Sequence, residues 1–477
     1  KVRRLASREY RGIAKPPGET GTRPRRRDSF PEPAEDASMT DGDVTPLRAA
    51  AQTVYEKLTD EEDARACRDI PEEACRETPA SFVLILCGNF LTKLGDEIGN
   101  AKTVLPWLMS AVGAPMALTA LLVPLRESGS LLPQLAIAGY LRRLPLRKWV
   151  WAAGSIAQAL AIGAIGIAAA TLQGAAAGWT IVGLVALFSL ARGFCSVASK
   201  DVLGKTIPKK KRGQLNGWSA SAAGLVTLGV GFALAWAPPG GDGAFYAALL
   251  VAAALLWIAA AGVFAALREF PGETGGGDSA LRHAMASLGL LREDADFARF
   301  VLVRALFISS ALAAPYYVLL AQSHGNGSPL LLGLLVAMSG LSALLSGPIW
   351  GRFADASSRR VMLAAATIAS VTGLLVFAAA ALAPWLLGTP WFLPLAYFVL
   401  SVGHHGIRVG RKTYVVDLAG GNRRTDYVAV SNTLIGVVLL AAGGLSAAFA
   451  ALVAAALILA FALVGLAGVA LGAALRE

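Results

Sequence analysis

The 477-residue chain has little charge and few of the residues that build catalytic or metal sites. Only 16% of its residues are charged, whereas soluble domains average about 25%. Four cysteines, Cys67, Cys75, Cys87 and Cys195, are too few and too scattered for a disulfide framework. We expect the tail containing Cys67 and Cys75 to lie in a reducing compartment. The pair also lacks the further ligands that a zinc site needs, so no metal or other cofactor is expected.

Apolar residues make up 55% of the chain, and they lie in long blocks from Ser81 onward. A helix needs about 20 residues to cross the hydrocarbon, and twelve segments approach that length: 81–100, 113–140, 149–171, 178–199, 215–236, 244–267, 299–320, 330–350, 361–383, 391–407, 428–448 and 450–473. Backbone polar groups have no water partner in lipid, and the segments lack the strict alternation of barrel strands. The predicted fold class is therefore an all-α polytopic membrane protein.

The net charge of +11 does not indicate a nucleic-acid partner. Residues 1–80 hold 15 basic and 17 acidic residues, so the positive excess lies between the apolar segments. By the positive-inside rule, both termini face the cytoplasm, and we expect a bacterial inner (plasma) membrane location. The basic residues that set this orientation follow every second span: Arg142, Arg143, Arg147, Lys148; Lys200, Lys205, Lys209, Lys210, Lys211, Arg212; Arg268, Arg282, Arg292; Arg352, Arg359, Arg360; Arg408, Arg411, Lys412, Arg423 and Arg424.

Four regions follow from these patterns. Residues 1–80 form a largely disordered cytoplasmic tail, with a short amphipathic helix within 47–68, and we hypothesise that 1–38 lie outside the natural chain. The long connection 268–298 is a cytoplasmic linker that separates a six-helix half, 81–267, from a second, 299–477.

An internal repeat supports two equivalent halves. Matching landmarks recur at shifts of 212 to 218 residues: Ala80–Leu84 with Ala298–Leu302, Gly139, Arg147 and Lys148 with Gly351, Arg359 and Arg360, and Arg192 and Asp201 with Arg408 and Asp417. Two parallel six-helix halves predict a pathway between them near the bilayer midplane.

The sharpest motif follows the eighth span, where Gly351, Asp355, Arg359 and Arg360 fit the spacing Gly-x-x-x-Asp-x-x-x-Arg-Arg. Small residues permit close helix approach, the acid caps or pairs across a helix end, and the arginines anchor the turn at the headgroups. This loop resembles the signature of the major facilitator superfamily, and the resemblance covers about residues 81–475. It implies gating roles for these residues. The first-half copy keeps Gly139, Arg147 and Lys148 but has Arg143 where the acid would stand, which puts its gating pair in doubt.

The resemblance implies a secondary transporter rather than an enzyme. Such a protein moves a small solute by alternating access, and we expect coupling to protons, contact with membrane lipids and a monomeric state. The alternative is a membrane-embedded enzyme or scaffold that keeps the fold without transport. Gly204-Lys205-Thr206 ends like a phosphate-binding loop but lacks its first glycine. Adjacent His404 and His405 have no acid at metal-ligand spacing.

Polar residues inside the spans are the candidate site, since each charge there costs about 3 kcal/mol without a partner. The first two spans carry polar stripes that we expect to face each other: Asn89, Thr92, Lys93, Asp96 and Asn100, and Glu127, Ser130 and Gln134, with Arg126 nearby. Asp96, Glu97 or Glu127 is the expected proton-binding group, with Lys93 and Arg126 tuning it. The alternative is that Lys93 neutralises Asp96 or Glu97 on its own helix.

Five further candidates lie deeper in the chain. Arg192 and Arg408 either line the pathway, as the resemblance implies, or extend to the cytoplasmic headgroups. On the seventh span, Arg304 precedes Pro315, which we expect to kink the helix. Tyr316 and Tyr317 line the pathway or belong to the outer aromatic belt.

Overall fold

The described residues are helical apart from short turns, and in this computed structural model they comprise 46–58, 72–236, 243–272, 274, 289–325, 328–418, 424–449 and 454–476. The hypothesis about residues 1–38, the disorder expected over 1–45 and most of the linker 268–298 lie outside them. The predicted amphipathic segment is confirmed in part as α1, Pro46–Leu58, whose Tyr55 ring packs edge-on 5.3 Å from Phe82.

The N-terminal helices form from long apolar runs that end at glycine, proline or basic residues. They are α2 (Glu72–Arg76), α3 (Thr78–Ile98), α4 (Val104–Ala111), α5 (Met116–Leu131), α6 (Gln134–Leu141), α7 (Lys148–Thr171), α8 (Gly174–Thr206), α9 (Lys209–Ala235) and α10 (Gly243–Ala265).

The C-terminal helices follow the same order. They are α12 (Leu290–Glu293), α13 (Ala295–Leu306), α14 (Ser309–His324), α15 (Pro329–Ala356), α16 (Ser358–Leu382), the short 3₁₀ helix η2 (Pro384–Gly388), α17 (Phe392–Leu418), α18 (Arg424–Ala448) and α19 (Ala454–Gly472). Asp294 caps α13 by accepting hydrogen bonds from the backbone of Asp296 and Phe297.

Ten helical segments among the described residues are long and apolar enough to cross a membrane, rather than the twelve expected. The second expected span, 113–140, is broken into α5 and α6 at Pro133, whose missing N–H cannot continue the helix. The tenth, α17, is long enough, but it carries Arg408, Arg411 and Lys412 and fails on composition. A proline break explains the first difference, and polar content explains the second.

The seventh expected span also differs in detail. Its helix breaks at Phe307, between α13 and α14, whereas the predicted kink site Pro315 lies inside the regular α14. Ser309 and Ser310 follow the break directly, and the hydroxyl of Ser310 donates to the Phe307 carbonyl at 3.0 Å. A side-chain donor thus satisfies a carbonyl that the broken helix leaves free.

The buried apolar residues form three clusters, and their distribution is uneven. One cluster joins the N-terminal and C-terminal helices on the side away from the basic loops, with Trp107 and Leu335 among its members. On the side of the basic loops, the N-terminal helices have a separate cluster around Phe264, and the C-terminal helices have another around Phe300. The two groups of helices therefore share a core on one side only.

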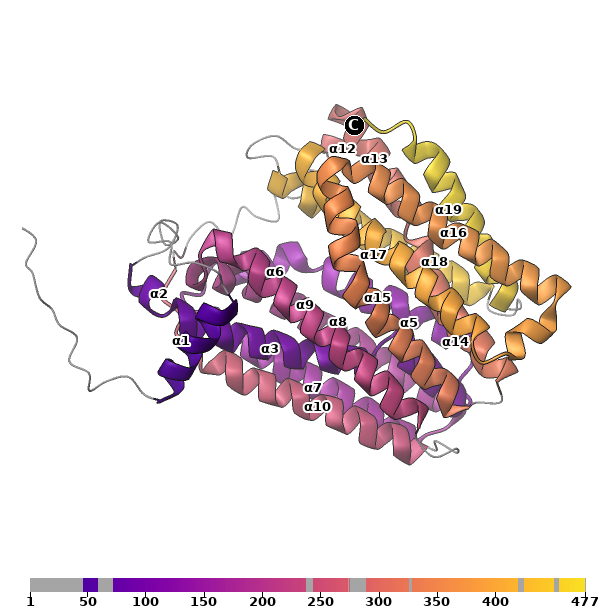
Figure 1. Cartoon of the computed structure of the whole chain (residues 1–477), viewed down its shortest axis with the longest axis horizontal. Helices are drawn as coiled ribbons and strands as arrows, with labels where there is room; N and C mark the ends of the chain where they lie inside the picture. The colour runs from indigo at the N-terminus through magenta and orange to yellow at the C-terminus, as the bar shows by residue number, and fades with distance from the viewer. Residues whose placement is uncertain are drawn as a thin grey trace, which may run out of the picture. The chain divides into compact units, whose positions relative to one another are not determined.

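Two helix pairs connect the N-terminal and C-terminal groups, namely α5 with α18 and α9 with α15 (Figure 1). Gly231 of α9 packs so closely that a Cβ would lie 2.3 Å from the backbone nitrogen of Ala337. Gly443 of α18 similarly meets the Pro124 ring, at 2.3 Å. Only glycine permits such approach of two helices.

These contacts repeat at one of the shifts found in the sequence. Gly224 and Gly231 of α9 precede Gly436 and Gly443 of α18 by 212 residues, the offset that separates Gly139 from Gly351. Gly224 approaches Gly340 of α15, and Gly436 approaches Leu132 beside α5. Helix α15 occupies the place in the C-terminal helices that α5 occupies in the N-terminal ones, and α18 likewise corresponds to α9. The repeat therefore relates the contact of α5 with α18 to the contact of α15 with α9.

Candidate functional site

The tightest ion-pair network lies between α3, α5 and α8. Arg126 donates from Nη2 to Oδ1 of Asp96 at 2.9 Å, and Arg192 donates from Nη1 to the same oxygen at 2.6 Å. The Asp96 side chain is 15% exposed, and the Arg126 guanidinium lies 4.6 Å from the Phe188 ring centroid. Two cations thus bind one buried carboxylate through charge-assisted hydrogen bonds. The polar stripes of α3 and α5 therefore face each other, and Arg192 contacts Asp96 instead of only extending to the headgroups.

Lys93 interacts electrostatically with Asp96 and Glu97 on its own helix, but it forms no ion pair with either. Lys93 makes no ion pair with a described residue, and Glu97 instead accepts a hydrogen bond from Nδ2 of Asn100 at 2.9 Å. Lys93 does interact electrostatically with Arg408 of α17. For Asn89 and Gln134, no side-chain hydrogen bond joins them to the part of the chain that the structure describes, and their pathway role stays a prediction.

A second polar chain crosses between the two groups of helices. The Lys102 ammonium lies 3.6 Å from Oε1 of Glu127 and 3.1 Å from Nε2 of His404 on α17. Nδ1 of His404 lies 3.0 Å from the hydroxyl of Ser310 on α14. The expected proton-binding carboxylate Glu127 is thus connected, through one lysine and one histidine, to the C-terminal helices.

Arg304 on α13 is buried without a carboxylate partner. Its guanidinium donates to the Ser431 hydroxyl and, at 2.8 Å, to Oδ1 of Asn432, both on α18. Its Nε has no hydrogen-bond partner, and the residue is 7% exposed. The charged group that interacts with it is another cation, Arg411 of α17. A buried cation with neutral partners is costly unless an anion completes the site.

Three more basic side chains lie near Arg304 or next to its neighbour Arg411, all on α17: Arg408, Arg411 and Lys412. We call these three with Arg304 the C-terminal basic cluster. None of the four forms an ion pair within the described part of the chain. Arg408 and Lys412 are exposed, and Lys412 interacts electrostatically with Lys93 and Lys200 of the N-terminal helices. Their exposed side therefore faces the N-terminal helices.

The first gating loop is clamped by two acids that lie outside it. Arg147 pairs with Asp201 of α8, and Lys205 bridges Asp201 at 2.9 Å and Glu269 at 3.0 Å. The buried Glu269 carboxylate also accepts from the backbone nitrogens of Arg147 and Lys148, at 2.8 and 2.6 Å. Within the loop, Arg143 stands at the position where the motif has an acid. Asp201 and Glu269 thus supply the missing negative charge from outside the loop. Lys205 therefore has a structural role in this ion-pair network, and its presence needs no phosphate-binding loop to explain it.

The second gating loop is held by the end of α19. Arg359 donates from Nη1 to the carbonyl of Leu475 at 2.6 Å, and Ser357 caps α16 by accepting from the backbone of Arg360 at 3.2 Å. Gly351 has open space around it. The side chain of Asp355 lies outside the described part of the structure, so its gating role stays a prediction.

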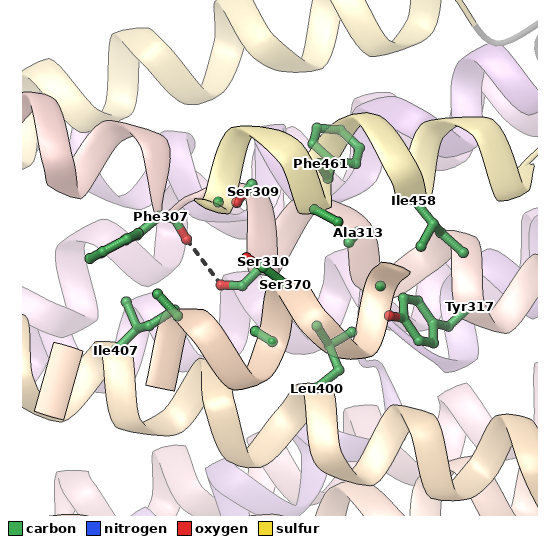
Figure 2. Close-up of a pocket in the computed structure, with 15 residues that line it drawn as sticks. Phe307, Ser309, Ser310, Ala313, Tyr317, Ser370, Leu400, Ile407, Ile458 and Phe461 are labelled. Atoms are coloured by element: carbon green, nitrogen blue, oxygen red, sulfur yellow. Dashed lines mark hydrogen bonds between the residues drawn. The ribbon is translucent and has the colours of Figure 1, made fainter. Parts of the chain in front are cut away.

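The two tyrosines of α14 are buried, Tyr316 at 2% and Tyr317 at 0% exposure, so neither belongs to an outer aromatic belt. Tyr317 lines a small cavity between α14, α16, α17 and α19 (Figure 2). Figure 2 also shows the Ser310 hydroxyl directed at the Phe307 carbonyl. The cavity has a volume of about 10 Å³, room for about one water molecule. It is too small for a solute.

The described cysteines differ in their bonding. Cys75 is disulfide-bonded, which contradicts the expectation that the tail thiols are reduced, whereas Cys87 and Cys195 are free. No group of three potential metal ligands occurs among the described residues. Sequence reasoning missed Lys102, Arg411 and Glu269 as network residues. Each is a charged residue just outside an expected span. The sequence could not show its role, because its partners lie on segments far away in the chain.

Solved structures with this arrangement are transporters. A mutant of the nucleoside transporter NupG superposes with a TM-score of 0.64 at 12% identity, covering 83% of this chain and all of that one. A D-xylose-proton symporter gives 0.63 at 12% identity, over 83% of this chain and 97% of its own. The chain has the major facilitator fold. A bacterial metal transporter is more distant, with a TM-score of 0.52 at 16% identity, over 81% of this chain and 98% of its own.

Sequence relatives carry no assigned activity. Uncharacterised proteins of Mycobacterium tuberculosis and Mycobacterium bovis are 25% identical over 374 residues, which cover 74% of this chain and 68% of theirs. No protein-family model matches the chain. The fold is therefore established by structure, and the solute has to be inferred from the site.

Proposed function

We propose that this protein is a secondary active transporter that moves a small solute by alternating access of two six-helix halves, coupled to protons. In this proposal α5 with α6 forms the second span and α17 the tenth, which restores twelve spans. The basic loops face the cytoplasm of a bacterial cell, as the positive-inside rule predicts.

One observation carries the proposal, the exchange of the two inter-half interfaces under the sequence repeat. The pair α5 and α18 maps onto the pair α15 and α9, and the close-contact glycines of α9 and α18 differ by 212 residues. Two equivalent interfaces permit one half to rock against the other about an axis between them.

The distribution of the apolar clusters supports an assignment of the conformational state. The halves share one core on the side away from the basic loops, which includes Trp107 and Leu335, and have separate cores on the basic side. This asymmetry supports a conformation closed to the outside and accessible from the cytoplasm. Outward opening then has to separate the contact of α9 with α15 and that of α5 with α18.

Glu127 is the carboxylate that we propose for proton coupling. Asp96 is already bound by two arginines, Arg126 and Arg192. Glu127 is 43% exposed, and its cation Lys102 also contacts His404 of the other half. Protonation of Glu127 would release Lys102 and so alter the contact between the halves.

The interface provides a direct test. Gly231→Val places a side chain against the Ala337 backbone, and overpacking of this kind costs about 1–3 kcal/mol. The closed contact is then weakened, and outward-open molecules become more frequent. A reporter, Leu335→Cys in a background without other cysteines, should react at least about fivefold faster with an impermeant maleimide added outside.

Gly229→Val is the matched control, because a Cβ at Gly229 meets nothing within 4 Å. Its labelling rate should equal that of the parent. A second reporter, Lys412→Cys on the cytoplasmic side, should react more slowly in the Gly231→Val protein. Equal rates at Leu335→Cys in both variants would contradict alternating access, and so would faster labelling of both reporters, since that indicates loosening alone.

A further inference from the structure

Resting on the proposed transport function, we propose that the solute is an anion with at least two negative charges, bound by Arg304, Arg408 and Arg411 of the C-terminal half. The proposal names a substrate class and places its recognition in one half of the molecule.

The first reason is the shortage of carboxylates around these arginines. Arg304 bonds to Ser431 and Asn432, both neutral, and Arg411 is the charged group that acts on it. Arg408 and Arg411 repel each other, and Glu127 of the opposite half is the carboxylate that reaches Arg411. Glu127 and Glu97 also act on Arg408, so the carboxylates that act on these three arginines within the described residues both belong to the N-terminal half.

The second reason is an unsatisfied donor at a buried position. Arg304 is 7% exposed, and its Nε has no hydrogen-bond partner. Buried polar groups are normally hydrogen-bonded, and a guanidinium left incomplete is costly. An anion beside Arg304 and Arg411 would accept from both, in the bidentate geometry that arginine offers to phosphate and carboxylate groups.

The third reason is depth. At 1.5 Å per residue, Arg408 lies about 24 Å along α17 from Phe392, whereas the hydrocarbon is about 30 Å thick. On this measure Arg408 lies within the hydrocarbon, whereas Lys412 lies at its edge. Cations without an ion pair at membrane depth mark a pathway for an opposite charge, and the Arg408 side chain is exposed.

The other cations of the network do not compete for this role. Arg126 and Arg192 are occupied by Asp96, and Lys102 by Glu127 and His404. The solute charge should exceed one, since three guanidinium groups are available to it and the two carboxylates that act on them are already engaged by Lys102 and Asn100. Phosphate esters, di- and tricarboxylates and phospholipid headgroups share this chemistry.

The test is the melting temperature of the purified full chain in detergent at constant ionic strength. Inorganic phosphate, glycerol phosphate, succinate and citrate form one arm, and glycerol and choline are the neutral and cationic comparisons. Mixed micelles containing phosphatidic acid or phosphatidylcholine form the lipid arm. Ligands that bind the folded state raise its melting temperature, so at least one multivalent anion should do so in the wild type.

Arg408→Gln and Arg411→Gln should each weaken the affinity for that anion by about tenfold, the loss expected for one charge-assisted hydrogen bond. Arg304→Gln should act likewise, and the exposed Arg408 keeps the test valid if the buried variant misfolds. Arg352→Gln, an exposed basic residue of α15 outside the cluster, should bind like the wild type. An equal response in all variants would identify a general salt effect and overturn the proposal.

The arms separate the possible results. A response to soluble phosphates or carboxylates identifies a metabolite anion, whereas a response to phosphatidic acid alone identifies a lipid headgroup as the same chemistry. Stabilisation by choline or glycerol without any anion response overturns the anion proposal. That result leaves alternating access intact, because the maleimide experiment at Leu335 does not depend on the solute.

Discussion

The N-terminal helices, α2–α10, and the C-terminal helices, α12–α19, which we call the two halves, handle buried charge in opposite ways. In the N-terminal half, Asp96 is neutralised by Arg126 and Arg192, and Glu127 by Lys102. In the C-terminal half, Arg304 and the basic residues of α17 have no ion pair with a described residue. The two groups of helices thus repeat the same backbone arrangement, but these ionic side chains are paired in one group and lack ion pairs with described residues in the other.

That difference suggests a division of labour between the halves. A balanced network is stable without a ligand, and it is suited to transferring a proton between fixed groups. A group of unpaired cations is unstable alone and gains by binding an anion. The comparison predicts that charge-removing substitutions change stability in opposite directions in the two halves.

Asp96→Asn should have the largest effect. It leaves two guanidinium groups without a carboxylate, and breaking a buried ion pair costs about 3–5 kcal/mol. We expect a clear fall in the melting temperature of the purified protein. A variant that combines Asp96→Asn with Arg126→Gln and Arg192→Gln should recover part of this loss, because no charge is then left unpaired. An unchanged melting temperature for Asp96→Asn would remove the contrast between the halves.

Glu269→Gln should have the next largest effect. The Glu269 side chain is 0% exposed, and its carboxylate binds Lys205 and the backbone of Arg147 and Lys148. An amide keeps part of this bonding but loses the charge, and we expect a loss of about 2–3 kcal/mol in the free energy of unfolding. Thermal denaturation measures it. Glu293→Gln, a change on the exposed α12, serves as the control and should leave the melting temperature unchanged.

Arg411→Gln should act in the opposite direction. It relieves repulsion between Arg411, Arg304 and Arg408, so the ligand-free protein should gain about 1 kcal/mol or less. Arg126→Gln is the matched comparison in the other half, and it should lose stability. A clear loss in Arg411→Gln would show that an unrecognised acid pairs with this arginine, and the basic cluster would then resemble the N-terminal network.

Sequence reasoning could reach the fold because hydropathy, loop charge and the repeat each reflect short-range physics. The same reasoning placed the stripe of Asp96 opposite that of Arg126, since helical periodicity fixes which residues share a face. It could not identify the partner of Asp96 among three nearby cations. The choice of Arg126 and Arg192 over Lys93 depends on how α3, α5 and α8 pack together, which local spacing does not encode.

The break at Pro133 and the polar α17 show a related limit. A hydropathy window treats 113–140 as one span, although a proline without an N–H divides it into α5 and α6. The same window finds α17 too polar to span, although its charges face the opposite half. Helix-breaking and charged residues therefore distort the pattern that identifies a membrane helix.

Glu127→Gln should change stability least and mechanism most. The ion pair with Lys102 is 3.6 Å long, and Glu127 is 43% exposed, so its loss should cost less than about 1 kcal/mol. The amide cannot bind or release a proton. In proteoliposomes loaded with an anion found in the binding screen, uptake driven by a pH gradient should stop while exchange without a gradient continues. Gradient-driven uptake at the wild-type rate would remove Glu127 from the coupling step, and it would make the charge balance of the N-terminal half a matter of stability alone.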